Sequence, residues 1–212
     1  MKGCAFVLML AVPTFALAVI IDRIAVVIGR SIVKDSDIDR DVRVTELLNG
    51  DPLDLSNAAR KKAANRLIDQ IFIRREIELA DYPPATNKET EQQLNQLEKG
   101  RFKAPGFFEQ ALHRYGVAAI DIRTQVQWQL TILRFVDLRF RPAVLITDEE
   151  IDKYYRDHMA ALRREYPGKG PDELRSQVRD ILTGEKVNTQ FFAWLDDQRK
   201  NNRVEFREES LR

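Results

Sequence analysis

The segment that most constrains the fold runs from Pro171 to Arg207, and it predicts a long helix followed by a short strand. Its apolar residues recur at spacings of three and four, the period of one helical face: Leu174, Val178, Ile181, Leu182, Val187, Phe191, Trp194 and Leu195. After Asn201 and Asn202, the run Arg203–Arg207 alternates polar and apolar residues, as an edge strand does. A lone strand needs a partner, and the other strong strand signal lies near the start of the mature chain. We therefore predict that the two ends of the protein meet in one small sheet.

Residues 1–18 have the layout of a secretory signal peptide. Lys2 supplies a positive charge, and an apolar run extends from Cys4 to Leu17 before small residues at the cleavage point. A membrane anchor is the alternative, but it needs about 20 apolar residues, and Asp22 and Arg23 end the run early. We expect export to the periplasm, with no stable membrane insertion after cleavage.

The mature chain is neutral but dense in charge. The whole sequence has 34 basic and 33 acidic residues, and the signal segment contains only Lys2, so 33 of each remain. This balance argues against a nucleic-acid partner, for which one basic face is expected. The single cysteine lies in the signal segment. A mature chain without thiols suits an oxidising compartment, and its core must hold it together without disulfides.

The remainder of the chain predicts a hairpin and a series of helices. β-branched residues from Ile21 to Val33 surround a turn at Gly29-Arg30, which is typical of a tight hairpin. Ser36-Asp37-Ile38-Asp39 predicts the N-cap of a helix that ends near Leu48. Further helices are expected over Asn57–Ala80, Thr86–Lys99, Pro105–Gly116 and Ala118–Phe140, and from the capping box at Thr147. The fold class is therefore mainly α, with a small antiparallel sheet that joins the N-terminal hairpin to the C-terminal strand.

The helix expected over Ala118–Phe140 carries two apolar stripes on nearly opposite sides. Ile122, Val126, Leu130, Leu133 and Phe140 form one stripe, and Trp128, Ile132, Phe135 and Leu138 form the other. A helix in the middle of a bundle is one interpretation. The other is that one stripe packs on the core and the second lines a groove for a partner.

Catalytic and metal-binding patterns are sparse. His113 and His158 are the only histidines, and each has no cysteine or second histidine nearby. Glu149 and Glu150 belong to a capping box, and an adjacent pair on an exposed first turn is no acid–base dyad. The Pro167–Pro171 break lacks the spacing of a phosphate loop. We expect no catalytic residues, no metal and no cofactor.

Three stretches together are similar to the SurA-type periplasmic chaperones. The run Ile21–Gly29 with Ser36–Asp39 resembles the opening of the N-terminal domain of that family. Ile146–Tyr155 is similar to the helix that leads into a parvulin proline isomerase domain. Phe191–Arg199 with Val204-Glu205-Phe206 resembles the C-terminal helix and strand that return to complete the N-terminal domain. The resemblance implies one helical chaperone domain over residues 19–165, completed by residues 171–207.

The chain departs from this family at one place. Where the family carries one or two isomerase domains, this sequence has only Pro167–Pro171. The paired histidines and the cysteine or aspartate of a parvulin site have no position here. We therefore predict a chaperone core without proline isomerase activity.

The resemblance implies ATP-independent holding of unfolded exported or outer-membrane polypeptides on apolar surfaces. The residues predicted to form an apolar cradle for such clients are Phe102, Phe107, Phe108, Tyr115, Trp128, Ile132 and Phe135. Ordinary core packing is the alternative for each of them. Two other functions remain open: an assembly subunit with one specific partner, and a cryptic isomerase. A homodimer formed by swapping the C-terminal helix at Pro167–Pro171 is also possible.

Overall fold

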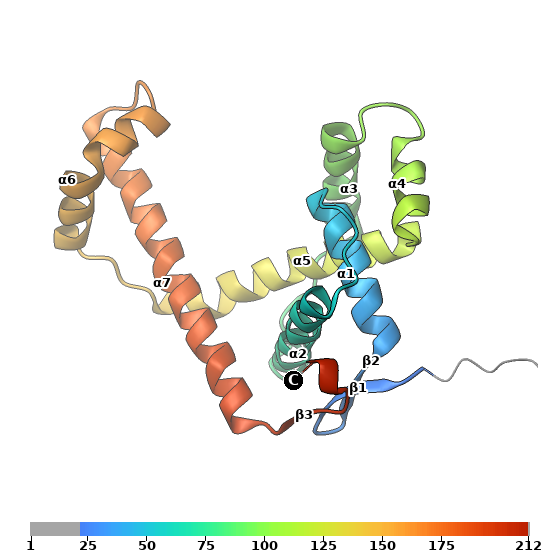
Figure 1. Cartoon of the computed structure of the whole chain (residues 1–212). Coiled ribbons are helices and arrows are strands. Elements are labelled where there is room, and N and C mark those ends of the chain that lie inside the picture. Colours follow the sequence, from blue (N-terminus) through green and yellow to red (C-terminus); the bar gives the residue numbers. More distant parts are fainter. Residues whose placement is uncertain (1–21, 212) are drawn as a thin grey trace, which may run out of the picture.

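The computed structural model describes residues 22–211, and within them it is mainly helical with one small antiparallel sheet (Figure 1). The predicted fold class is confirmed, whereas the predicted signal peptide lies outside the described residues. The elements follow in the order β1 (Ile24–Ile28), β2 (Ser31–Lys34), α1 (Asp35–Asn49), α2 (Asn57–Leu79), α3 (Asn87–Arg101), α4 (Phe107–Tyr115), α5 (Ala119–Phe140), η1 (Arg141–Ala143), α6 (Asp148–Glu165), α7 (Pro171–Asn201), β3 (Val204–Phe206) and η2 (Glu209–Leu211).

The sheet joins the two ends of the described chain, as predicted. Its strand order is β2-β1-β3, so the C-terminal strand pairs with the outer edge of the hairpin. Val26 lies opposite Phe206, and Ile28 lies opposite Val204, in antiparallel register. The Arg207 backbone N–H extends this ladder by donating to the Ala25 carbonyl at 2.8 Å. The small sheet therefore depends on backbone pairing between two segments that lie near opposite ends of the sequence.

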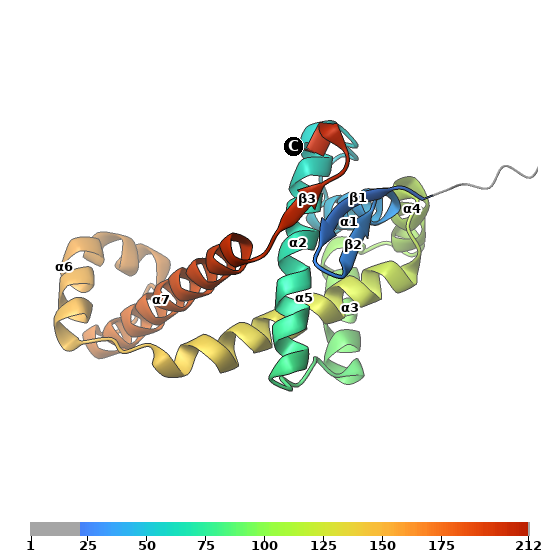
Figure 2. The same cartoon turned by 90° about the horizontal axis from the view of Figure 1, so that it is seen from below.

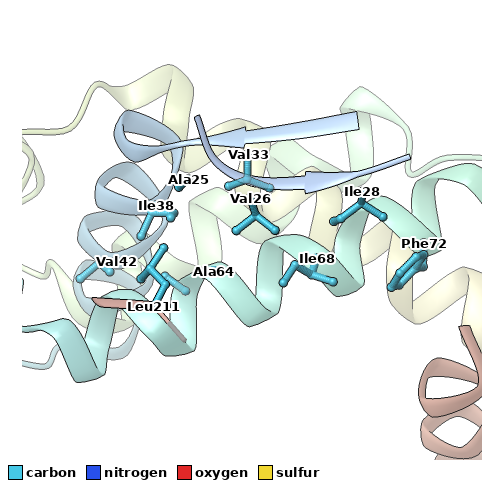
Figure 3. Close-up of a cluster of buried hydrophobic side chains, with 11 residues drawn as sticks. Ala25, Val26, Ile28, Val33, Ile38, Val42, Ala64, Ile68, Phe72 and Leu211 are labelled. Atoms are coloured by element: carbon cyan, nitrogen blue, oxygen red, sulfur yellow. The ribbon is translucent and has the colours of Figure 1, made fainter. Parts of the chain in front are cut away.

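One face of the sheet packs on α2 and builds the first core cluster (Figure 3). Val26, Ile28 and Val33 point from the hairpin towards α2. On α2, Ala64, Ile68 and Phe72 recur every four residues. The spacing of four keeps these side chains on one helical face. The cluster also includes Ala25 of β1, Ala63 of α2, Ile38 and Val42 of α1, and Leu211 of η2. Burying each large aliphatic or aromatic side chain contributes roughly 1.5–3 kcal/mol, so α2 is the central element of this half.

The first helix does not begin as predicted. It starts at Asp35, directly after β2, and its N-cap position is Lys34, which makes no side-chain capping hydrogen bond. Ser36 instead donates its backbone N–H to Asp22 at 3.2 Å and its hydroxyl to the same carboxylate at 2.5 Å. Ser36 is not the N-cap, because β2 enters α1 without a loop, but Asp37 of the predicted run does bond the N-cap by accepting the Lys34 backbone N–H at 3.1 Å. A carboxylate distant in sequence therefore bonds the first turn.

α5 spans the molecule and separates two groups of helices (Figure 1). α3 and α4 lie near one end of α5, while α6 and the first half of α7 form a hairpin beyond the other end, and Figure 2 shows the same separation. The predicted break at Pro167–Pro171 is the turn of this hairpin, since α6 ends at Glu165 and α7 begins at Pro171. The hairpin has its own cluster of buried residues, formed by Ile151, Leu162, Leu174 and Val178.

The two apolar stripes of α5 are both used for packing, but along different parts of the helix. Ile122 and Val126 pack with residues of α1, α3 and α4. Trp128 and Phe135 of the second stripe pack with α2 and α7, and Phe140 at the end of the first stripe joins them. The bundle interpretation therefore holds for most of the helix. Each stripe also leaves one leucine exposed, Leu133 at 66% and Leu138 at 47%.

Candidate functional site

The residues predicted to form an apolar cradle are divided between two clusters. Phe102, Phe108 and Tyr115 are half-buried in the cluster around α3 and α4, where the rings of Phe102 and Phe108 lie 5.3 Å apart. The Tyr115 hydroxyl donates to the Asp51 carbonyl at 2.5 Å. Phe107 is different, because 52% of it is exposed at the start of α4. Phe107 lies outside this cluster of packed residues and is the most exposed of the four.

The other predicted residues belong to the cluster between α2, α5 and α7. Phe135 is fully buried, with the rings of Tyr82 at 5.2 Å and Trp194 at 5.7 Å. Trp128 is only 6% exposed, and Ile132 is half-buried beside them. Phe135 and Trp128 therefore serve the core, which was the alternative interpretation for both. The seven residues do not make one continuous surface, and client binding by the accessible ones stays a prediction.

A groove not anticipated from the sequence runs along α2. Its first part is a hollow of about 280 Å³ between β2, α1, α2 and α5. Ile32 and Val33 line it from β2, Leu67 and Ile71 from α2, and Thr124 from α5. The lining is mixed, because aliphatic side chains of β2 and α2 lie among polar and charged side chains of α1, α2 and α5. Such a mixture suits a segment that has both apolar and polar groups.

Two further hollows continue this groove. One of about 640 Å³ lies beside the hairpin turn and is lined by Arg30, Ser31, Phe72 and Arg75, among others. The other, of about 250 Å³, lies between α2 and α5. Arg74 lines all three hollows. We call the combined depression the α2 groove, with Arg74 at its centre.

Arg74 is positioned by a tryptophan. Its guanidinium carbon lies 3.9 Å from the centroid of the Trp128 ring, a favourable contact between a cation and an aromatic face. Burial against this neighbourhood lowers the pKa of Arg74, while the nearby Glu78 carboxylate opposes that change. The ring nitrogen of Trp128 is itself buried without a hydrogen-bond partner among residues 22–211. The stacking therefore fixes the direction of the arginine at the junction of α2 and α5.

The carboxylates of the first hollow are all paired with arginines. Arg66 donates to the Asp41 carboxylate through Nε at 2.9 Å and Nη2 at 2.5 Å. Burial raises the pKa of Asp41, and the charge of Arg66 counteracts this. Arg40 lies 3.5 Å from Asp37 and 3.7 Å from Asp121. These groups hold α1 against α2 and α5, with two arginines shared among three carboxylates.

The groove also borders a free strand edge. β2 is the outermost strand of the sheet. In β1, the backbone N–H and C=O groups of Ala25 and Val27 point towards β3. Val27 is the partner of Ile32 in β2. Because backbone groups alternate in direction along an antiparallel pair, those of Ile32 point away from β1. The exposed edge thus presents a donor and an acceptor beside the α2 groove.

The groove residues were missed at the sequence level, although a signal exists. Arg74, Arg75 and Glu76 interrupt the apolar run from Ile71 to Ile77, and charged residues within a core helix mark a change from buried to accessible surface. Nothing in the sequence shows that Arg30, more than forty positions away, lies beside them. Only the folded structure brings Arg30 next to Arg74 and Arg75.

The two histidines lie on separate helices of the described chain. His113 is exposed on α4, and His158 on α6 has its Nδ1 3.0 Å from the Tyr154 carbonyl. Within residues 22–211, no group of three or more histidine, cysteine, aspartate or glutamate side chains is arranged to hold a metal ion. Nor is any helix of that range both long and apolar enough to span a membrane.

A comparison of the chain with models of protein families and with curated proteins found no match.

Proposed function

We propose that the protein is an ATP-independent chaperone that holds unfolded exported polypeptides, outer-membrane proteins among them. The observation that carries this proposal is the open α2 groove, in which Ile32, Leu67 and Ile71 supply apolar surface next to a free strand edge. An unfolded polypeptide offers the matching groups, namely apolar side chains and unpaired backbone N–H and C=O groups. The return of β3 to the hairpin is also the feature that the resemblance to SurA-type chaperones implies.

The proposed mechanism is weak and reversible holding. Exposed apolar side chains occur on separate elements, such as Phe107 on α4, Leu133 on α5 and Phe192 on α7, which is 63% exposed. Covering each contributes at most about 1.5–3 kcal/mol, and ordering the client offsets part of this. Because each contact is weak, a client held by several of them dissociates without an energy source. Unfolded outer-membrane strands, which alternate apolar and polar residues, fit such contacts.

The proposal is tested by light scattering from an unfolded porin diluted out of denaturant. A few-fold molar excess of the protein should delay the rise in scattering, because captured strand segments no longer pair with one another. An unrelated unfolded protein should be protected as well. Unchanged scattering for both substrates would count decisively against a chaperone. Protection limited to one substrate would favour an assembly subunit with a specific partner.

Two subsidiary proposals have their own measurements. We expect no turnover of a short proline peptide in an isomerisation assay, and turnover that is abolished by changing His113 or His158 would overturn that expectation. A swapped homodimer would exchange α7 at the Pro167–Pro171 turn. Sedimentation analysis of the purified protein distinguishes the dimer from a monomer.

A further inference from the structure

The α2 groove carries an excess of positive charge at one end. Arg30 of the hairpin turn and Arg74 and Arg75 of α2 line the same hollow, and Glu78 is the one carboxylate among its lining residues. No ion pair or hydrogen bond holds any of these three guanidinium groups within residues 22–211, although Arg74 has its aromatic contact. Three cations against one anion leave the hollow positive in a chain that is close to neutral overall.

This imbalance is unusual for the molecule. Most arginines elsewhere are held by a partner: Arg60 pairs with Asp35, Asp39 and Glu208, and Arg199 pairs with Asp69. Uncompensated charges that converge on a hollow attract a group of opposite sign, and guanidinium groups bind carboxylates with particular strength. A carboxylate ligand at this hollow is therefore favoured by charge complementarity.

The neighbouring strand edge indicates what carries the carboxylate. Ser31 of β2 lines the arginine hollow, and Ile32 lines the adjoining one. The outward backbone groups of Ile32 bind another backbone in extended conformation, as in strand addition to a sheet edge. A free phosphate or a lipid headgroup has no backbone that could pair with these groups as a strand does. An extended polypeptide uses both the edge and the arginines.

We propose that the α2 groove binds an extended acidic segment of a client polypeptide as a fourth strand alongside β2. Its aspartate or glutamate side chains lie at Arg30, Arg74 and Arg75, and its apolar side chains lie over Leu67 and Ile71. This inference names the client segment for the chaperone proposed above and rests on that function. It predicts selection for acidic strands over neutral ones of the same hydrophobicity.

The charge requirement is tested by fluorescence anisotropy with a labelled peptide of about ten residues. The peptide alternates valine and threonine and carries aspartates near its middle, and its matched partner carries asparagines instead. The acidic peptide should bind about tenfold more tightly, with an advantage that falls as salt is added. Equal binding of the two peptides would overturn the proposal.

Substitution of the arginines tests whether the positive charge of this hollow binds the acidic peptide. Replacing Arg30→Gln and Arg75→Gln together, with Arg74 left stacked on Trp128, should weaken binding of the acidic peptide about tenfold or more. The matched control is Arg156→Gln with Arg163→Gln on α6, where both arginines are exposed and without an ion pair among the described residues. The control removes the same charge and should leave binding unchanged. Equal losses in both variants would overturn the proposed location.

The strand geometry is tested by backbone N-methylation of the acidic peptide at alternate residues. Successive backbone groups of a strand point in opposite directions, so one set of methyl groups should abolish binding and the complementary set should leave it intact. Equal binding of both methylated peptides would refute strand addition. Binding of anionic phospholipid vesicles, with no binding of either peptide, would refute a peptide occupant.

Failure of this inference and failure of the chaperone proposal have different signatures. If scattering of the diluted porin is suppressed but the acidic peptide has no advantage, the chaperone role stands and the acidic fourth strand does not. If the acidic peptide binds as expected but no aggregation is suppressed, the groove is a peptide site of a protein that is not a chaperone.

Discussion

Arg74 on α2 covers the ring of Trp128 on α5, with 3.9 Å between the guanidinium carbon and the ring centroid. This contact lies where the three hollows of the α2 groove meet. Trp128 is only 6% exposed, so the arginine shields it from solvent on the groove side. One side chain therefore connects the packing of the core with the charge of the surface above it.

Arg74→Ala should destabilise the protein modestly and expose the indole. We expect a loss of about 0.5–2 kcal/mol in the free energy of unfolding, the range of a cation stacked on an aromatic ring. Tryptophan emission should shift to longer wavelength as water reaches Trp128. Urea denaturation followed by fluorescence measures both. Arg75→Ala, one residue further along α2 and without a ring contact, should show neither change; an identical response in that variant would exclude the stacking as the cause.

Leu211→Ala should be far more costly than its place near the end of the chain suggests. Leu211 is fully buried against α2 in the first core cluster. Removing a buried leucine side chain typically costs about 2–5 kcal/mol, and urea denaturation measures the difference. Leu79→Ala is the control, because Leu79 is 74% exposed at the end of α2 and its loss should cost less than about 0.5 kcal/mol. Similar values for the two variants would contradict the packing of η2.

Glu89→Gln should reduce stability at neutral pH but not in acid. The Thr86 backbone N–H and hydroxyl each donate to the Glu89 carboxylate at 2.7 Å, and Arg134 pairs with it. These contacts, the Thr86 backbone bond first, lower the pKa of Glu89 below its ordinary value. A carboxylate with a lowered pKa in the folded state stabilises it above the unfolded pKa, and this stability is lost as pH falls through the folded pKa.

The measurement for Glu89 compares urea midpoints of the two proteins at several pH values from about 6 down to about 3. The difference between parent and variant should shrink steadily on acidification. Glu98→Gln, on the same helix, is the control, since Glu98 caps no helix and pairs with no cation in the described chain. A difference that stays constant across the pH range would show that the carboxylate contributes nothing through its charge.

Phe107→Ser should weaken chaperone activity without unfolding the protein. Phe107 is half exposed on α4, so its replacement should change the free energy of unfolding by less than about 0.5 kcal/mol. Loss of one apolar client contact of about 1 kcal/mol corresponds to roughly fivefold weaker suppression of porin aggregation. Leu79→Ser provides an exposed apolar control on another element. If both variants lose activity equally, clients bind apolar surface without preference for α4.

The two ends of the chain show why local pattern predicted so much of the fold. Val204 and Phe206 alternate with polar residues, and Ile24 to Ile28 is β-branched apart from Ala25. Each segment needs a strand partner, and the other segment is the one available. The helix limits followed from proline, glycine and capping residues. Thr147, for example, caps α6 by accepting from the Glu150 backbone N–H at 3.3 Å. Such signals act over a few residues and can be read directly.

The candidate site was predicted less well because accessibility is not a local property. Phe135 and Phe107 are the same residue type on helices, yet one is fully buried and the other is half exposed. Which of them is covered depends on where α7 crosses α5, and no short pattern specifies that. The cap expected at Ser36 was mispredicted for the same reason. The Asp22 carboxylate lies beside Ser36 because β1 and β2 are paired.

The sequence by itself determined the mainly helical class, most helix limits and the closure of the small sheet, because propensity and period act through neighbours along the chain. The tertiary structure alone decided that Arg30, Arg74 and Arg75 share a hollow beside the free edge of β2. Backbone pairing and burial bring residues of distant segments together, and the charge that results at the groove belongs to their arrangement in space.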